Sequence, residues 1–207
     1  MSIRSLGFSA VLGAALFASA AADASVATYT DKSQWTADVS GPITNTTTDP
    51  NVGSTTSSIT LDDGTVIGLD RSLSVVTIGS GWATWSGGYT GVVYTDYNST
   101  SIGATVTPVT ALGFEIEPDP FDLIEISLTL VDGSVITQNV QGDSGAAFYG
   151  WIGTGITSFT ISSQEDFAFG NFYTAGAAAP TPEPLTLSLM GAGLAGIGAL
   201  RRRKARA

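Results

Sequence analysis

The sequence predicts an all-β protein whose central part is an antiparallel, jelly-roll-like β-sandwich. Apolar and polar residues alternate from Leu123 to Val131, which is the pattern of a strand with one buried face. Two Asp-Gly pairs, at 63–64 and 132–133, lie between apolar runs and are typical of two-residue hairpin turns. Further short β-type runs follow at the spacing of about 8–12 residues that antiparallel sandwiches show.

Apolar segments flank this body and divide the chain into four expected parts: a signal peptide at 1–24, the sandwich at 25–174, a linker at 175–181 and a tail at 182–207. The first part has the features of a secretory signal peptide: Arg4, an apolar run from Leu6 to Phe17, and the small-x-small site Ala22-Asp23-Ala24. A buried amphipathic helix is the alternative, but the run lacks a polar face.

Within the body, one short helix is expected near the start. Asp31 is placed to cap it, Gln34 is at the third helical position, and Trp35 is expected to pack inward. Residues 45–58, rich in Thr, Ser, Asn and Gly, predict a long loop or a weak edge strand. The expected strands are 59–61, 65–69, 73–78, 89–95, 102–107, 110–117, 123–131, 134–140, 146–152, 156–162 and 166–173. The side chains expected inside one core are those of Ile124, Ile126, Leu128, Leu130, Phe114 and Phe159.

Composition excludes several classes of function. The chain has no cysteine and no histidine, which excludes disulfide scaffolds, Cys-ligated zinc and Ser–His or Cys–His nucleophiles. Its net charge is −10, and between residues 25 and 180 sixteen acidic residues face only two basic ones, Lys32 and Arg71, a net −14. A body this acidic disfavours nucleic acid and other anionic partners.

The last part predicts a single transmembrane helix. Residues 185–200 are sixteen residues without a charge, which in a helix rise about 24 Å against a hydrocarbon core of about 30 Å. A soluble helix is the alternative, but the four glycines of this run disfavour it. Five basic residues follow and predict a cytoplasmic end: Arg201, Arg202, Arg203, Lys204 and Arg206.

The triplet Pro182, Glu183 and Pro184 precedes this apolar span. Together with the span and the basic cluster, it resembles the PEP-CTERM protein-sorting tail of Gram-negative bacteria that make extracellular polysaccharide. The resemblance implies that exosortase, a membrane transpeptidase-like enzyme, recognises the triplet and removes the tail. It further implies export, here expected through the Sec translocon, a transient inner-membrane anchor, and a final place at the cell surface or in the extracellular matrix.

The body also resembles the β-sandwich of many PEP-CTERM proteins, over residues 110–173. Those sandwiches look like lectins or carbohydrate-binding jelly rolls, so the resemblance implies a sugar-binding or purely structural body. The stretches that carry it are 111–114, 132–133, 148–150, 156–161 and 167–172.

Two groups of residues are candidate binding sites. The carboxylates of Glu115, Glu117, Asp119 and Asp122 are close in sequence and of the type that Ca²⁺ prefers, although a solvated turn is the alternative; no other cofactor is expected.

The second group is aromatic, and its members lie in a Gly/Ser/Thr-rich stretch that suits stacking on sugar rings: Trp82, Trp85 and Tyr89. The alternative is ordinary core. Since Trp82 and Trp85 are three residues apart, in a strand they would face opposite sides.

The expected function is therefore a secreted, non-enzymatic surface or polysaccharide-matrix protein whose body is structural or carbohydrate-binding. The alternative is a glycosidase-like enzyme with a carboxylate pair drawn from Glu115, Glu117, Glu125 and Glu165, since such chemistry needs no His or Cys.

Overall fold

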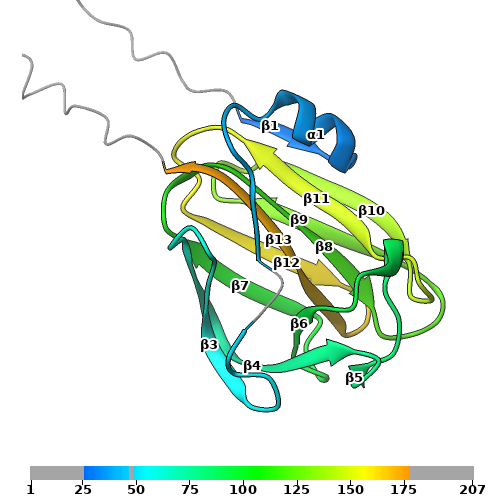
Figure 1. The fold of residues 1–207 in the computed structure, drawn as a ribbon. Coiled ribbons are helices and arrows are strands. Elements are labelled where there is room, and N and C mark those ends of the chain that lie inside the picture. Colours follow the sequence, from blue (N-terminus) through cyan, green and yellow to red (C-terminus); the bar gives the residue numbers. More distant parts are fainter. Residues whose placement is uncertain (1–25, 47–48, 178–207) are drawn as a thin grey trace, which may run out of the picture.

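The computed structural model describes residues 26–46 and 49–177, and the strands in these ranges form one sheet that bends until it is nearly closed (Figure 1). The strands are β1 Ala27–Tyr29, β2 Thr44–Thr46, β3 Thr55–Thr60, β4 Val66–Ile78, β5 Gly81–Trp82, β6 Val92–Thr95, β7 Ser101–Val106, β8 Val109–Pro118, β9 Leu123–Leu130, β10 Val135–Gln141, β11 Ala147–Ile152, β12 Ser158–Ser163 and β13 Phe167–Ala177. The helices are α1 Lys32–Asp38 and the 3-10 turn η1 Ser86–Gly88.

The sheet follows the order β1-β11-β8-β13-β6-β4-β7-β12-β9-β10, while β2, β3 and β5 pair at the side with β13, β4 and β4. All these pairs are antiparallel except β4–β5. The all-β antiparallel prediction is therefore confirmed, although the structure has one continuous, nearly closed sheet in place of two separate ones.

The long strand β4 is the reason for this continuity. Its first part pairs with β7 at 67–69 and its second part pairs with β6 at 74–76. The two separate strands expected at 65–69 and 73–78 are thus one strand that passes from one half of the sheet to the other.

The core lies between the two halves of the sheet. The Phe114 ring on β8 and the Phe159 ring on β12 are 5.2 Å apart between centroids, which confirms that they share one core. The Tyr149 hydroxyl on β11 crosses the same space and donates to the Ile126 carbonyl on β9 over 3.0 Å. The predicted inward residues of β9 are all buried: Ile124, Ile126, Leu128 and Leu130.

The cap prediction is confirmed, and hairpin turns do form at both Asp-Gly pairs, although each loop has three residues, 62–64 and 131–133, in place of two. Gly64 and Gly133 have φ of 85° and 86°, the left-handed conformation that glycine adopts without strain in tight turns. The Asp31 carboxylate accepts from the backbone N–H groups of Ser33 and Gln34 at the start of α1, over 2.7 and 3.0 Å. Trp35 is fully buried, as expected.

The segment expected as a loop or weak edge strand contains β2 and β3, so part of it is strand. At the other end, β13 continues into the predicted linker because Ala175 and Ala177 still pair with Ala111 and Val109 on β8. The predicted signal peptide and tail lie outside the described residues. Within the described ranges, the structure has no helix of the length and apolarity needed to span a bilayer.

Leu128→Ala should lower the free energy of unfolding of the body by about 2–5 kcal/mol, because it removes a fully buried side chain and leaves a cavity. Leu123→Ala on the same strand is the matched control: Leu123 is 60% exposed, so the change should be within about 0.5 kcal/mol. Urea denaturation of residues 25–180 measures both, and equal effects would contradict the observed burial of β9.

Candidate functional site

The half of the sheet made of β11, β8, β13 and β6 is covered on its outer side as well as on its core side. α1 covers one part of this outer face, where Trp35 packs on Phe148 and Tyr173 with ring centroids 5.6 and 6.4 Å apart (Figure 1). The segment 79–91 covers another part. Because both faces of β8 are covered, its residues are almost all buried and do not alternate.

Two carboxylates of β8, Glu115 and Glu117, fasten the segment 79–91 to the sheet. Residues two apart in a strand point to the same side, so both side chains point outward toward the cover. The indole N–H of Trp85 donates to Glu115 over 2.8 Å, and that of Trp82 donates to Glu117 over 3.1 Å. Each pair satisfies a buried donor and a buried acceptor at once.

Glu117 is the more enclosed of the two, with no exposed surface. Burial raises the pKa of its carboxyl above the ordinary value, although hydrogen bonds from Trp82, Gly145 and Thr84 act in the opposite direction. Its surroundings are those of an internal structural carboxylate, and it has no surface on which a ligand could bind.

A β-bulge in β13 forms the next wall of the site. The register against β8 shifts between Gly170 and Tyr173, and Asn171 has a φ of 53°, a left-handed conformation that Asn tolerates better than most residues. The bulge leaves Phe169 and Phe172 in the main core while Tyr173 joins the outer cluster around Trp35. Asn171 and Tyr173 are thereby presented on the same outer face.

A cavity of about 410 Å³ lies where the two covers meet. This volume is within the range of small-molecule sites, roughly 300–1,000 Å³. Its walls come from α1, β2, the η1 turn, β8 and the bulge of β13. The residues that line it are Lys32, Asn45, Ser86, Gly87, Gly88, Tyr89, Glu115, Asn171 and Tyr173.

The charges in this cavity balance each other. The Lys32 ammonium is 3.8 Å from the Glu115 carboxylate, lies 4.0 Å from the centroid of the Tyr173 ring and donates a hydrogen bond to the Tyr173 hydroxyl. Lys32 is one of only two basic residues in the body, and the other, Arg71, pairs with Asp70 and Asp96. The cavity therefore has a polar lining in which the one positive and the one negative side chain are paired.

Two amide side chains add hydrogen-bonding groups that the protein does not fully use. The Asn45 amide donates to the Asn171 side-chain oxygen over 3.1 Å. The Asn45 side-chain oxygen is buried and accepts no hydrogen bond from any described residue. A buried acceptor without a donor is costly, so this oxygen is an incompletely satisfied polar group beside the cavity.

The aromatic residues predicted to bind sugar divide between two environments. Trp82 and Trp85 are each 5% exposed and form a buried cluster with Val93 and Ala168, so neither offers an open ring face. They do not lie in one strand, so the alternation that would place them on opposite sides does not apply: Trp82 ends β5 while Trp85 precedes η1, and both turn toward β8. The alternative of an ordinary core position fits both. Tyr89, at 6.0 Å from Trp85 between ring centroids, does line the cavity.

The acidic run predicted to bind calcium does not gather around one point. Glu115 and Glu117 accept from the tryptophans, while the Asp122 carboxylate accepts from the backbone N–H of Leu123. Asp119 lies at the start of the following turn, where its backbone N–H donates to the Asp166 carbonyl over 2.9 Å. Among the residues described, no three acidic side chains are arranged to hold a metal ion, and the calcium site stays a prediction.

The carboxylate pair of the enzymatic alternative is not assembled in the cavity. In the described part of the chain, Glu115 is the one carboxylate among the lining residues. Glu117, its neighbour on the same face, is enclosed and cannot touch a substrate. Glycoside hydrolysis by the usual route needs two carboxylates that flank one bond.

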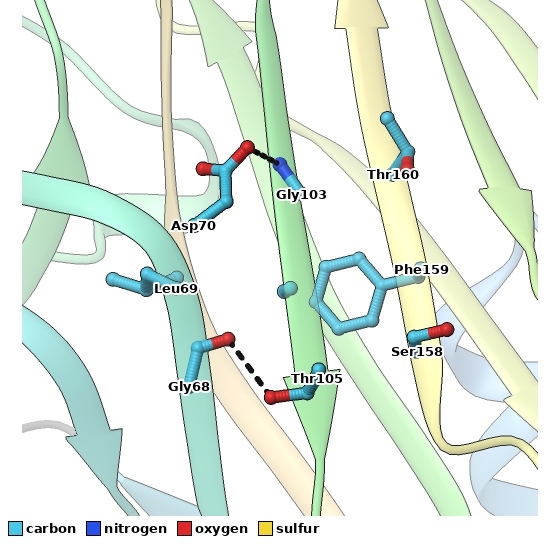
Figure 2. Close-up of a pocket in the computed structure, with 9 residues that line it drawn as sticks. Gly68, Leu69, Asp70, Gly103, Thr105, Ser158, Phe159 and Thr160 are labelled. Carbon is cyan, nitrogen blue, oxygen red and sulfur yellow. Dashed lines mark hydrogen bonds between the residues drawn. The ribbon is translucent and has the colours of Figure 1, made fainter.

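A second hollow, of about 320 Å³, lies over β4, β7 and β12 (Figure 2). There the Asp70 carboxylate accepts from the Gly103 N–H over 3.0 Å, and the Thr105 hydroxyl donates to the Gly68 carbonyl over 3.4 Å. These contacts join β4 to β7. Its lining residues include no basic residue and no side-chain amide, so the first cavity is the stronger candidate site.

Sequence reasoning did not select four of the residues that shape the site: Lys32, Asn45, Asn171 and Tyr173. One signal was available. A Gly-Asn pair at 170–171 interrupts an aromatic strand pattern, and an isolated glycine in a strand is typical of a bulge. The other three residues carry no local signal.

Glu117→Gln should flatten the dependence of stability on pH. Because the folded-state pKa of Glu117 is raised, its contribution is most favourable below the ordinary value of 4.5 and declines as pH rises through the raised pKa. Glutamine keeps an oxygen that can accept from Trp82 but does not ionise. Melting temperatures measured above pH 4.5 should therefore fall less in the variant than in the unmodified body.

The control for this experiment is Glu125→Gln, which replaces an exposed glutamate of β9. If the melting temperatures of the unmodified body and of Glu117→Gln change with pH in the same way over the whole range, Glu117 is not a buried carboxyl with a raised pKa.

Comparison with known proteins adds little about the body. No curated protein matches the chain. Among solved structures, the chain is similar to a family two carbohydrate esterase from Cellvibrio japonicus, with a TM-score of 0.30 and 9% identity over 73% of this chain and 34% of that chain. The chain thus spans about a third of that esterase, and a likeness of this extent carries no argument.

The comparison with protein families is informative for the tail. A family model described as the PEP-CTERM protein-sorting motif matches residues 180–204. This range includes the Pro-Glu-Pro triplet, the apolar span and the basic residues Arg201 to Lys204, all outside the described residues. Such a motif implies processing by exosortase and a location at the cell surface or outside the cell. The chain carries a PEP-CTERM protein-sorting motif at residues 180–204.

Proposed function

We propose that the body is a non-catalytic, carbohydrate-binding module and that exosortase sorting delivers it to the outer surface or the polysaccharide matrix. The sorting motif supports the destination. On the way there, the chain crosses the inner membrane through the Sec translocon and is anchored in that membrane until the tail is removed. The cavity between α1, η1 and β13 is the ligand site.

The observation that carries the binding proposal is the polar cavity itself, in whose wall the Asn45 amide keeps one side-chain oxygen without a donor. Beside it, the Asn171 amide and the Ser86 hydroxyl supply further donors and acceptors. A sugar has hydroxyl groups that both donate and accept, so it can pair with all of these groups.

The charge of the body and the aromatic ring at the cavity indicate which class of sugar could bind there. An acidic body with a paired Lys32–Glu115 couple disfavours anionic ligands and has no free positive charge in the cavity to offset that effect. The Tyr89 ring, which is half-buried at the cavity, provides flat apolar surface of the kind that packs on the C–H face of a pyranose. We therefore infer a neutral or weakly polar sugar unit of a polysaccharide as the ligand.

Asn171→Gly should weaken this binding about tenfold, which corresponds to about 1.4 kcal/mol, because it removes the amide at the cavity wall. Glycine suits the left-handed backbone at this position, so the fold should be retained. A glycan array on residues 25–180, followed by titration of the best ligand into both proteins, measures the effect.

Asn139→Ala is the matched control, since Asn139 is an exposed amide on β10 and does not line the cavity. It should leave the affinity unchanged. If no glycan on the array binds above background, the purely structural body is favoured. If Asn171→Gly binds the glycan as tightly as the unmodified body, the ligand does not bind in this cavity.

A further inference from the structure

The described body begins and ends at the same end of the sheet. Ala27, Ile152, Ala111 and Ala175 are register partners in one row across β1, β11, β8 and β13. Three strand spacings separate the first from the last, which is about 14 Å. Figure 1 shows the start of β1 and the end of β13 at this end of the molecule.

The last residues of β13 are firmly held. Ala177 pairs with Val109 on β8. The Thr110 hydroxyl donates to the Ala175 carbonyl over 2.8 Å and contacts the Gly176 carbonyl at 3.3 Å. The folded body therefore extends to within a few residues of the sorting motif.

The short chain between β13 and the motif limits where the sorting enzyme can work. From Ala177 to Pro182 there are five Cα–Cα steps, which reach at most about 18 Å when fully extended. This is shorter than the diameter of a small domain, about 30 Å. An enzyme that binds the Pro-Glu-Pro triplet must then lie against this end of the body.

The surface at this end, here called the sorting face, comprises the exposed residues Pro42, Asp63, Gly64, Thr107 and Pro108. These residues surround a hollow of about 250 Å³ that Gly176 also lines, so the chain leaves the body at the rim of the hollow. A body with a net charge of −14 is not attracted to anionic lipid headgroups, which favours a protein partner over the membrane surface.

We propose that the sorting face is the surface that exosortase contacts while it processes the motif. The hydrogen bonds from the Thr110 hydroxyl to the end of β13, here called the Thr110 clamp, limit the distance between the sorting face and the motif. The inference rests on the sorting motif and is independent of the carbohydrate proposal. The face is thus an interaction surface for a membrane enzyme, held at short range by the covalent connection.

Shortening the connection tests the distance. Deleting Ala178 and Ala179, which lie outside the matched motif, leaves three steps or about 11 Å. In a host with exosortase, the full-length variant should lose most of its processed product, as measured by mass spectrometry of its carboxyl terminus. Inserting four Gly/Ser residues at the same place should keep processing at the level of the unmodified chain.

The Thr110 clamp is tested in the shortened chain. Adding Thr110→Val removes the hydrogen bonds to Ala175 and Gly176 with a side chain of similar shape. The last residues of β13 are then held by backbone pairing alone and fray more easily, so part of the processing should return. Thr105→Val is the matched control: its hydroxyl contacts the Gly68 carbonyl and not β13, and it lies outside the sorting face, so it should not restore processing.

The contact itself is tested by crosslinking. The chain has no cysteine, so a single introduced thiol carries a photocrosslinker at one known place. Pro108→Cys and, as a second position, Pro42→Cys should crosslink the full-length chain to exosortase. Asn98→Cys, exposed at the opposite end of β7, should not.

The outcomes separate the inference from the sorting function. If the unmodified chain stays full length in the presence of exosortase, sorting itself is wrong and the inference falls with it. If the unmodified chain is processed but the shortened chain is processed equally well, or Asn98→Cys crosslinks as strongly as Pro108→Cys, the inference alone is overturned.

Discussion

Two hydrogen bonds between tryptophan indoles and buried carboxylates hold the outer cover of this sheet in place, and the candidate site depends on them. Trp82 and Trp85 donate to Glu117 and Glu115 on β8. Without these bonds, two carboxylates would be buried with fewer partners, which is costly, and the segment 79–91 would lose two of the contacts that join it to β8. With them, the segment becomes a fixed wall that brings Tyr89 to the cavity.

The bulge in β13 complements this wall from inside the sheet. A regular strand would alternate strictly, so it could not keep Phe169 and Phe172 in the core while presenting both Asn171 and Tyr173 outside. The additional residue solves this conflict, and Asn171 accepts the left-handed backbone. The site thus arises from a local irregularity placed between two covers.

The sorting motif and the cavity belong to different parts of the chain. A family model matches the sorting motif in the tail, whereas all residues that line the cavity belong to the folded body. The connection between them is short, and β13 is held up to Ala177 by pairing and by Thr110. The folded part of the chain and the sorting motif are therefore joined at one end of the sheet.

The sequence by itself determined most of the longer strands, the glycine turns at the two Asp-Gly pairs, the capped helix, the inward residues of β9 and the sorting motif. These features depend on neighbours in the chain: the alternation of side chains in a strand, the φ that glycine permits, the reach of Asp31 to nearby N–H groups, and the order of residues in a linear motif. Local physics is sufficient for them.

Only the tertiary structure decided that β4 joins both halves of the sheet, that Trp82 and Trp85 are both buried against glutamates, and where the cavity lies. Lys32 meets Tyr173 across 141 positions of sequence, and Asn45 meets Asn171 across 126. Such meetings follow from strand order and from how the covers pack, which no local pattern encodes. The candidate site could therefore be recognised only once β8, β13 and the two covers had been brought together.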